Sequence, residues 1–424
     1  MGLEMTTLFA ILLCVCFLLT KSDGSDDYFV NATIVRNDPR AVCLTGKPAS
    51  YYFDSGFSTG MRNWLVYLQG GAWCNNLEFC VAYAQRKNLT LDPKPYPFDY
   101  ILSNKKEVNP DFFNWNRVVV RYCDGSSFTS DSERIFEFNG TKLYFRGARI
   151  YKAVMQELLH KLGMSMAENA LLVGGSAGGV AVALHCDGFH DLLPHATRVK
   201  CLSDAGYFFP SKKFGHGEIF TPTFQGVMAH VPIKALPEEC TSRLSPYLCF
   251  FPQNVQQYIK TPIFFLMSAF DTVQVTWTFS ANDTIKECLT ISHNCSNDII
   301  KTLQDLRLEF LSVLPKQSNT TSSRGILITS STTHEQLSNY RWNSDMVVDG
   351  SNETIAKLFG NWYFGRKSVQ VIDKYQCPYN CSSSLVPNGN KANDKASGVV
   401  VFYYGLFVLI LVFDHLVSFL TVYY

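Results

Sequence analysis

One serine stands among small residues at positions 174–178, where the sequence reads GGSAG. The pentapeptide fits the G-x-S-x-G pattern, in which a sharp turn between a strand and a helix exposes the serine hydroxyl. The apolar residues ALLV precede this pattern and the small, apolar stretch AGGVAVALHC follows it. A serine becomes a nucleophile only when a base removes its proton and an acid orients that base. We therefore predict that Ser176 is a nucleophile with two partners elsewhere in the chain.

Two later segments supply the expected partners. In sites of this kind the acid and then the histidine follow the serine along the chain, just past the ends of later strands. The run TPIFFLMSAFD ends at Asp271, and the run GILITSSTTH ends at His334. Asp204, in CLSDAGYF, is the alternative acid. Neither His185, within the helix expected after the serine, nor His293, in a polar loop between two cysteines, is favoured as the base.

A glycine-rich segment, WLVYLQGGAWCNN at 64–76, could stabilise the negative charge that develops during ester cleavage. Lipases and esterases form an oxyanion hole from such a loop and from the amide that follows the nucleophile. The candidate donors are the backbone N–H groups of Gly71, Ala72 and Ala177. An ordinary turn after a strand is the other interpretation of the two glycines.

The elements that must position these groups are short, continuous apolar runs, each leading into a glycine-rich or polar turn. Such runs are typical of strands buried on both faces of a mostly parallel sheet. Helical patterns lie between them; at 147–163, apolar residues recur at every fourth position, and Gly163 is placed to end the helix. The alternation predicts an α/β fold with a mostly parallel central sheet flanked by helices.

Composition indicates an exported globular protein. The chain has 424 residues and a formal net charge of +1, which gives no basic field for nucleic acid. Residues 1–24 contain an apolar run followed by polar residues, which predicts a secretory signal peptide; an uncleaved anchor is the alternative. Residues 25–384 would then form the catalytic domain.

Cysteines and N-x-S/T triplets agree with export. Twelve cysteines follow the signal region, an even number that favours disulfides over metal in a secreted chain. We expect no metal and no cofactor. Close spacing favours the pairs Cys74–Cys80, Cys288–Cys295 and Cys377–Cys381. The glycosylation candidates are Asn31, Asn88, Asn139, Asn282, Asn319 and Asn352.

The C-terminal region changes composition at about residue 385. A polar linker at 385–398 precedes an apolar tail at 399–424, which contains one aspartate and one histidine. Three interpretations remain open: a GPI-attachment signal, a membrane-spanning helix, and a tail with no membrane role. Membrane attachment through this tail is therefore one of the outcomes to be tested.

Longer stretches resemble the plant pectin acetylesterase family, whose relatives include the animal carboxylesterase Notum. The similar segments occur in consistent order over about residues 31–381 and include LQGGAWCNN, NPDFFNWNRVVVRYCDGSSF, GGSAGGVAVALHCDGF, CTSRLSPYLCFFPQNV and NWYFGRKSVQVID. The resemblance implies an α/β-hydrolase-like fold and a Ser-Asp-His hydrolase that removes acetyl esters from pectin in the cell wall without a cofactor. It also implies the disulfides Cys43–Cys123 and Cys74–Cys80, with Cys186, Cys201, Cys240 and Cys249 pairing among themselves.

The chain departs from the plant pattern beside the histidine. Plant members place cysteines three residues before and one residue after it, whereas this chain has Ser331 and Glu335. The joint loss suggests a missing disulfide and puts the rigidity of the histidine loop in question. Alternative functions are an esterase for lipid or other acyl groups, an esterase for another acetylated polysaccharide such as xylan, and an inactive polysaccharide binder. The intact Ser176, Asp271 and His334 argue against the inactive binder.

Overall fold

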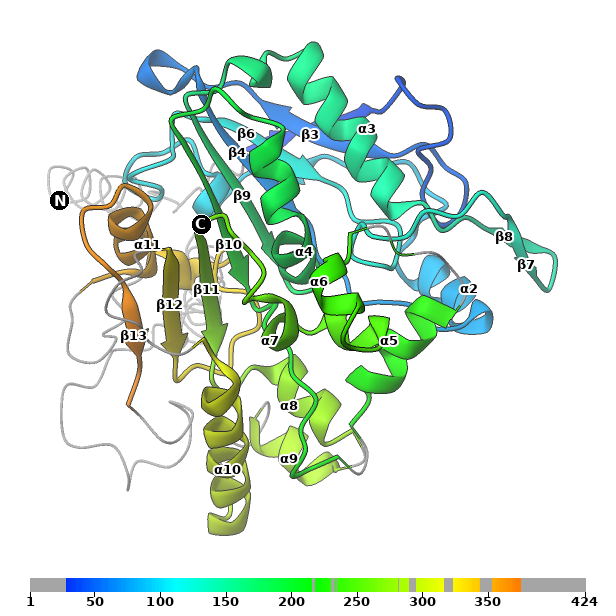
Figure 1. The fold of residues 1–424 in the computed structure, drawn as a ribbon, viewed down its shortest axis with the longest axis vertical. Helices are drawn as coiled ribbons and strands as arrows, with labels where there is room; N and C mark the ends of the chain where they lie inside the picture. Colours follow the sequence, from blue (N-terminus) through cyan, green and yellow to red (C-terminus); the bar gives the residue numbers. More distant parts are fainter. Residues whose placement is uncertain are drawn as a thin grey trace, which may run out of the picture. The chain divides into compact units, whose positions relative to one another are not determined.

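A nine-stranded sheet forms the centre of the computed structural model (Figure 1). The seven strands from β13 to β6 run parallel, and β3 and β2 extend one edge in antiparallel fashion. In spatial order the strands are β13 (Gln370–Ile372), β12 (Arg324–Thr329), β11 (Ile263–Ser268), β10 (Arg198–Asp204), β9 (Asn169–Gly175), β4 (Asn63–Leu68), β6 (Asn116–Val120), β3 (Ser50–Asp54) and β2 (Ala32–Ile34).

Helices cover both faces of this sheet. The longer ones are α2 (Leu77–Arg86), α3 (Gly147–His160), α4 (Ala177–Asp191), α5 (Phe220–Ala229), α10 (Asn297–Val313) and α11 (Ile355–Tyr363). Shorter helices are α6 (Glu238–Thr241), α7 (Pro252–Val255), α8 (Thr272–Thr278) and α9 (Asp283–Glu287). Two small antiparallel pairs lie outside the sheet: β1 (Phe29–Val30) with β5 (Tyr96–Pro97), and β7 (Phe136–Phe138) with β8 (Thr141–Leu143).

The two faces of the sheet bury separate apolar cores. Along β4, Val66 packs in the core shared with α3 and α4, while Leu65 packs in the core shared with α11. Every residue of β11 is buried. Successive side chains of a strand point to opposite faces, so a sheet covered on both sides requires apolar residues at every position. This requirement explains the continuous apolar runs in the sequence.

The predicted layout agrees with this architecture. The apolar runs WLVYL, RVVV, ALLV, IFFLM and GILIT lie in strands β4, β6, β9, β11 and β12 of the large sheet, in that order. The predicted helix at 147–163 is α3, which ends at His160, and Gly163 has the left-handed φ of 87° expected near a helix end. Strand β10 was not among the predicted runs, because Arg198 and Lys200 interrupt its apolar sequence.

Five disulfides link described residues, and three of them match pairs expected from the sequence or the resemblance. The pairs are Cys43–Cys123, Cys74–Cys80, Cys186–Cys201, Cys240–Cys249 and Cys288–Cys295. Cys186, Cys201, Cys240 and Cys249 thus pair among themselves. Cys377–Cys381 lies outside the described residues.

The structure describes residues 28–374 except 216–217, 230–232, 234, 281, 290–294, 316–322 and 344–352. The signal region, the linker and the apolar tail lie outside this range, so their assignments stay predictions. No helix within the described ranges combines the length and apolar character needed to cross a bilayer.

Candidate active site

Ser176 occupies a strained turn between β9 and α4. Its φ of 55° and ψ of −122° lie in a region that side-chain-bearing residues rarely adopt. Its amide donates to the carbonyl of Asp204, 3.0 Å away at the end of β10. The turn needs a glycine at position 178, because a Cβ there would collide with the carbonyl oxygen of Leu68 on β4. The close approach of two strands and a helix therefore explains the small residues around the serine.

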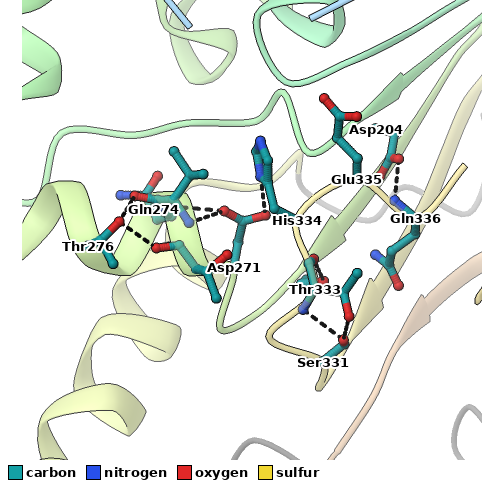
Figure 2. A network of polar contacts seen from close by, with 12 residues as sticks. Asp204, Asp271, Gln274, Thr276, Ser331, Thr333, His334, Glu335 and Gln336 are labelled. Carbon is teal, nitrogen blue, oxygen red and sulfur yellow. Dashed lines mark hydrogen bonds and ion pairs between the residues drawn. The ribbon is translucent and has the colours of Figure 1, made fainter. Parts of the chain in front are cut away.

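Asp271 contacts His334 directly. The imidazole Nδ1 lies 2.8 Å from Asp271 Oδ2 (Figure 2). The other carboxylate oxygen, Oδ1, accepts the amides of Val273 and Gln274 at 2.9 and 3.0 Å, so Asp271 caps α8. An ionised carboxylate only accepts hydrogen bonds, so Nδ1 donates and Nε2 is left to take a proton. Asp271 therefore holds both the orientation and the tautomer of His334.

The three predicted residues follow strands that end at the same edge of the sheet. Ser176 follows β9, Asp271 follows β11 and His334 follows β12, and these strands run parallel in the order β9, β10, β11, β12. Asp271 is buried, Ser176 is 7% exposed, and the His334 side chain is 21% exposed. The carboxyl-terminal edge of the sheet thus carries all three groups, with the histidine the most accessible.

Charges around His334 favour its protonated form. Burial alone lowers the pKa of the imidazole, but the negative charge and hydrogen bond of Asp271 overcome that cost. The carboxylates of Glu335 and Asp204 add smaller effects in the same direction, and the pKa of His334 rises to about 9. The neutral imidazole that can accept a proton therefore predominates only at alkaline pH.

Asp204, the alternative acid, contacts the loop backbone and not the imidazole. Its Oδ2 accepts the amides of Gln336 and Leu337, two and three residues after the histidine (Figure 2). Asp204 is fully buried, and this burial raises the pKa of its carboxyl to about 8. Asp204 therefore positions the segment that follows His334.

Hydroxyl groups hold the other side of the histidine loop. Ser331 Oγ donates to Thr333 Oγ1 at 2.8 Å and accepts the Thr333 amide at 2.9 Å (Figure 2). Ser268, at the end of β11, donates to the Thr333 carbonyl at 2.6 Å. These bonds tether the loop at the position where the plant pattern would have placed a cysteine.

The candidate oxyanion donors are oriented by hydrogen bonds to neighbouring carbonyls. Tyr83 donates to the Gly71 carbonyl at 3.0 Å, and because a trans peptide points its N–H opposite its C=O, this bond fixes the Ala72 amide. Ala72 itself has a φ of 65°. The Ala177 amide belongs to the first turn of α4, where N–H groups have no partner within the helix.

Two further residues, which the sequence patterns did not indicate, hold the peptides that follow Ala72 and Ala177. Tyr122 donates to the Ala72 carbonyl at 2.8 Å, and Ser127 Oγ donates to the Ala177 carbonyl at 2.7 Å. Ser127 also accepts the indole N–H of Trp73 at 2.7 Å, and its own amide donates to the Tyr122 hydroxyl. The feature of the sequence that could have indicated them is the segment RYCDGSSF. This segment directly follows β6, which lies next to β4 in the sheet.

The remaining candidates lie away from this edge or on the surface. His185 stacks on Tyr151, its Nε2 lies 3.0 Å from the Phe128 carbonyl, and burial lowers its pKa to about 4. His293 lies outside the described residues. Within the described ranges, no three His, Cys, Asp or Glu side chains are grouped so as to hold a metal ion. The described glycosylation candidates are exposed, at Asn31, Asn88, Asn139 and Asn282; Asn319 and Asn352 lie outside the described residues.

Known proteins resemble most of this chain. The family model described as pectinacetylesterase matches residues 24–385. The chain belongs to the pectinacetylesterase family. It is 42% identical to pectin acetylesterase 7 of Arabidopsis thaliana over 350 residues, covering 80% of this chain and 87% of the relative. Pectin acetylesterase 11 of the same plant is 41% identical over 346 residues.

A more distant branch of relatives is animal. The human palmitoleoyl-protein carboxylesterase NOTUM is 30% identical over 257 residues, which is 55% of this chain and 50% of the relative. Both branches are carboxylic ester hydrolases, so membership of the pectinacetylesterase family makes this chain a carboxylic ester hydrolase.

Proposed function

We propose that this protein is a serine esterase that removes acetyl groups from pectin in the plant cell wall, with Ser176, His334 and Asp271 as its catalytic residues. The contact between Asp271 and His334, on the edge where Ser176 sits in its strained turn, carries this proposal. The strand order and the turn at Ser176 support an α/β-hydrolase-like fold for the catalytic domain, residues 25–384. The names of the plant relatives support the acetylated pectin substrate.

The chemistry proceeds in two halves. Nε2 of His334 takes the proton of Ser176 while the serine oxygen attacks the acetyl carbonyl carbon. Negative charge develops on the carbonyl oxygen, where the amides of Gly71, Ala72 and Ala177 can stabilise it. The C–O bond to the sugar then breaks, and His334 gives its proton to the departing sugar oxygen. Water attacks the acetyl-serine by the same route and releases acetate.

Aromatic packing beside the site favours a small acyl group. Trp73 directly follows Ala72, and its ring lies edge-on to Phe208 and Trp277, with centroids 5.5 and 5.8 Å away. The Phe208 ring centroid is 6.2 Å from that of His334. These rings occupy space between the glycine-rich loop and the histidine, which supports acetyl over a long acyl chain as the substrate group.

Export supports action at the wall. The four described glycosylation candidates are exposed and the disulfides are those of an oxidising compartment, so we propose a secreted, extracellular enzyme. Anchoring at the cell surface through the 399–424 tail stays a separate prediction.

Substrate class is tested by three parallel assays of the purified protein and of Ser176→Ala. We expect the protein to release acetate from acetylated pectin, to do so more slowly from acetylated xylan, and to leave 4-nitrophenyl palmitate intact. Rapid cleavage of the palmitate ester with no acetate from pectin would instead favour the lipid esterase alternative.

A further inference from the structure

A second carboxylate, Glu335, lies beside the nucleophile. A Cβ placed on Gly70 would lie 3.0 Å from Glu335 Oε1 and 3.0 Å from Ser176 Cβ, so those two atoms lie no more than twice that distance apart. A Cβ on Gly175 would likewise meet the Glu335 carboxylate. The carboxylate thus lies between the glycine-rich loop and the serine turn.

The backbone directs Glu335 to this position. Its φ is 60°, an unusual value for a residue with a side chain. Figure 2 shows its carboxylate and the imidazole of His334 projecting to the same side of the loop. Ser338 Oγ donates to Glu335 Oε2 at 3.3 Å. Among the described residues, no lysine or arginine forms an ion pair with Glu335 that would cancel its charge.

Several neighbours respond to this charge. Glu335 contributes to the raised pKa values of His334, Asp204, Tyr67 and Tyr96, which come from the histidine loop, β10, β4 and β5. Apart from the imidazole, these groups are a carboxyl and two phenols; the cation Arg121 acts on Tyr52, whose ring lies 5.3 Å from that of Tyr96. An anionic substrate beside Glu335 would meet the positive charge of the imidazole, and that charge is lost when His334 becomes neutral for catalysis.

We propose that Glu335 selects uncharged acetyl esters, so that the preferred substrate is acetylated galacturonate whose carboxyl group is methyl-esterified. This inference rests on the proposed function. A free galacturonate carries its carboxylate on the same sugar ring as the acetyl ester. Like charges within several ångströms repel, and at an effective dielectric constant of about 20 this repulsion is enough for roughly tenfold discrimination after screening by salt.

The first experiment measures this discrimination on two pectins of equal acetyl content, one highly methyl-esterified and one demethylated. We expect the wild-type protein to release acetate from the methylated pectin about tenfold faster at pH 7.5. Glu335→Gln should bring the ratio of the two rates towards one. Because each ratio uses a single enzyme, a general loss of activity in the variant cancels.

The matched control is Glu168→Gln, which removes the same charge at the opposite edge of the sheet. Glu168 precedes β9 and pairs with Arg62 on the surface at 2.8 Å. This control should keep the wild-type ratio. An unchanged ratio in Glu335→Gln, or an equal change in the control, overturns the proposal.

A second pair of substrates separates this inference from the proposed function. The neutral ester methyl 4-acetoxybenzoate and the anionic 4-acetoxybenzoate differ in the methyl group that masks the carboxylate, and each enzymatic rate is divided by the rate of alkaline hydrolysis of the same compound to correct for the leaving group. We expect wild type to prefer the neutral ester after this correction, and we expect that preference to be smaller in Glu335→Gln. If neither pectin releases acetate but wild type still prefers the neutral aryl ester, the proposed pectin substrate is wrong. The same result would support charge selection at Glu335.

The effect of salt on the substrate preference of the wild-type protein tests the proposal even if Glu335→Gln fails to fold. Raising ionic strength from about 0.02 M to about 0.5 M shortens the screening length from roughly 20 Å to roughly 4 Å, so the preference for the neutral aryl ester should narrow. A preference that does not change with salt contradicts a charge-based selection.

Discussion

The two ends of the parallel strands differ in how they are built. At the carboxyl ends, Ala72, Ser176, Ala205 and Glu335 all have positive φ although none is glycine, and two buried carboxylates lie close by. Such backbone costs about 1–3 kcal/mol per residue and persists where surrounding contacts enforce it. At the amino ends, Arg62 and Glu168 form an ordinary exposed ion pair.

The chemistry of the charges differs in the same way. Lys200, in the first half of β10, donates to the Trp362 carbonyl at 2.9 Å and stacks over its ring at 4.4 Å. Arg198 lies over the ring of Tyr363 at 5.7 Å. These cations stabilise packing against α11, whereas Asp271 at the other end of the sheet holds an imidazole. The strained positions and the two buried carboxylates named above lie where chemistry is proposed, whereas the buried Arg117, at the amino end of β6, pairs with Asp54 and serves packing. Substitutions at the two ends should therefore separate activity from stability.

The largest effect on activity should come from Ser176→Ala. Loss of the proposed nucleophile should lower kcat/KM for 4-nitrophenyl acetate by about 10⁴-fold or more, with the melting temperature close to wild type. The matched control is Ser203→Ala on β10, which loses a buried hydrogen bond to the Gly179 carbonyl at 2.9 Å. That variant should lose about 1 kcal/mol of stability and retain near-normal activity. Activity above a few per cent in Ser176→Ala would remove the serine from its assigned role.

The next effect compares the two buried aspartates. Asp271→Asn should lower kcat by about 10⁴-fold, because the imidazole loses both its orientation and its compensating charge. Asp204→Asn should lower kcat far less, because an amide oxygen can still accept the loop amides of Gln336 and Leu337. Equal losses in the two variants would show that Asp204 acts on the imidazole as well.

A third effect concerns pH. His334 must be neutral to accept the serine proton, and its folded-state pKa of about 9 lies above the ordinary histidine value of about 6.5. Consequently kcat/KM should increase with pH and level off above about pH 9. Below that pH, each decrease of one pH unit should lower kcat/KM about tenfold. Glu335→Gln should move this rise to lower pH. A profile already flat above pH 6.5 contradicts the assigned environment of His334.

The smallest effect on activity should come from the amino ends. Lys200→Met removes the hydrogen bond and the ring contact with Trp362, so unfolding should become easier by about 1–2 kcal/mol. The kcat/KM for 4-nitrophenyl acetate should stay at the wild-type value, because Lys200 lies at the opposite edge from Ser176. Thermal denaturation and kinetics on one preparation measure both. A fall in kcat/KM of Lys200→Met without a fall in its melting temperature would contradict the separation of activity and stability between the two ends of the strands.

Local signals in the sequence predicted which segments meet at the edge where we propose catalysis. Continuous apolar runs and the small residues around Ser176 report directly on burial and on a tight turn, and Asp271 and His334 follow their strands within a few residues. The role of Asp204 was not predictable in this way, because it depends on β10 lying between β9 and β11. Polar residues interrupt the apolar sequence of β10, so the pattern of apolar runs did not predict that strand. The same reason explains why Tyr122 and Ser127 were missed, since their partners come from other strands.

The hydroxyl tether of the histidine loop has a consequence for redox chemistry. Ser331 and Thr333 hold this loop without sulfur, so a reductant has no bond to break there. The disulfides of the described residues lie elsewhere, for example between Cys186 of α4 and Cys201 of β10. Cys74–Cys80 adjoins the glycine-rich loop, so thiols should act on that loop or on the fold as a whole. The pH at which His334 titrates should be the same before and after mild reduction.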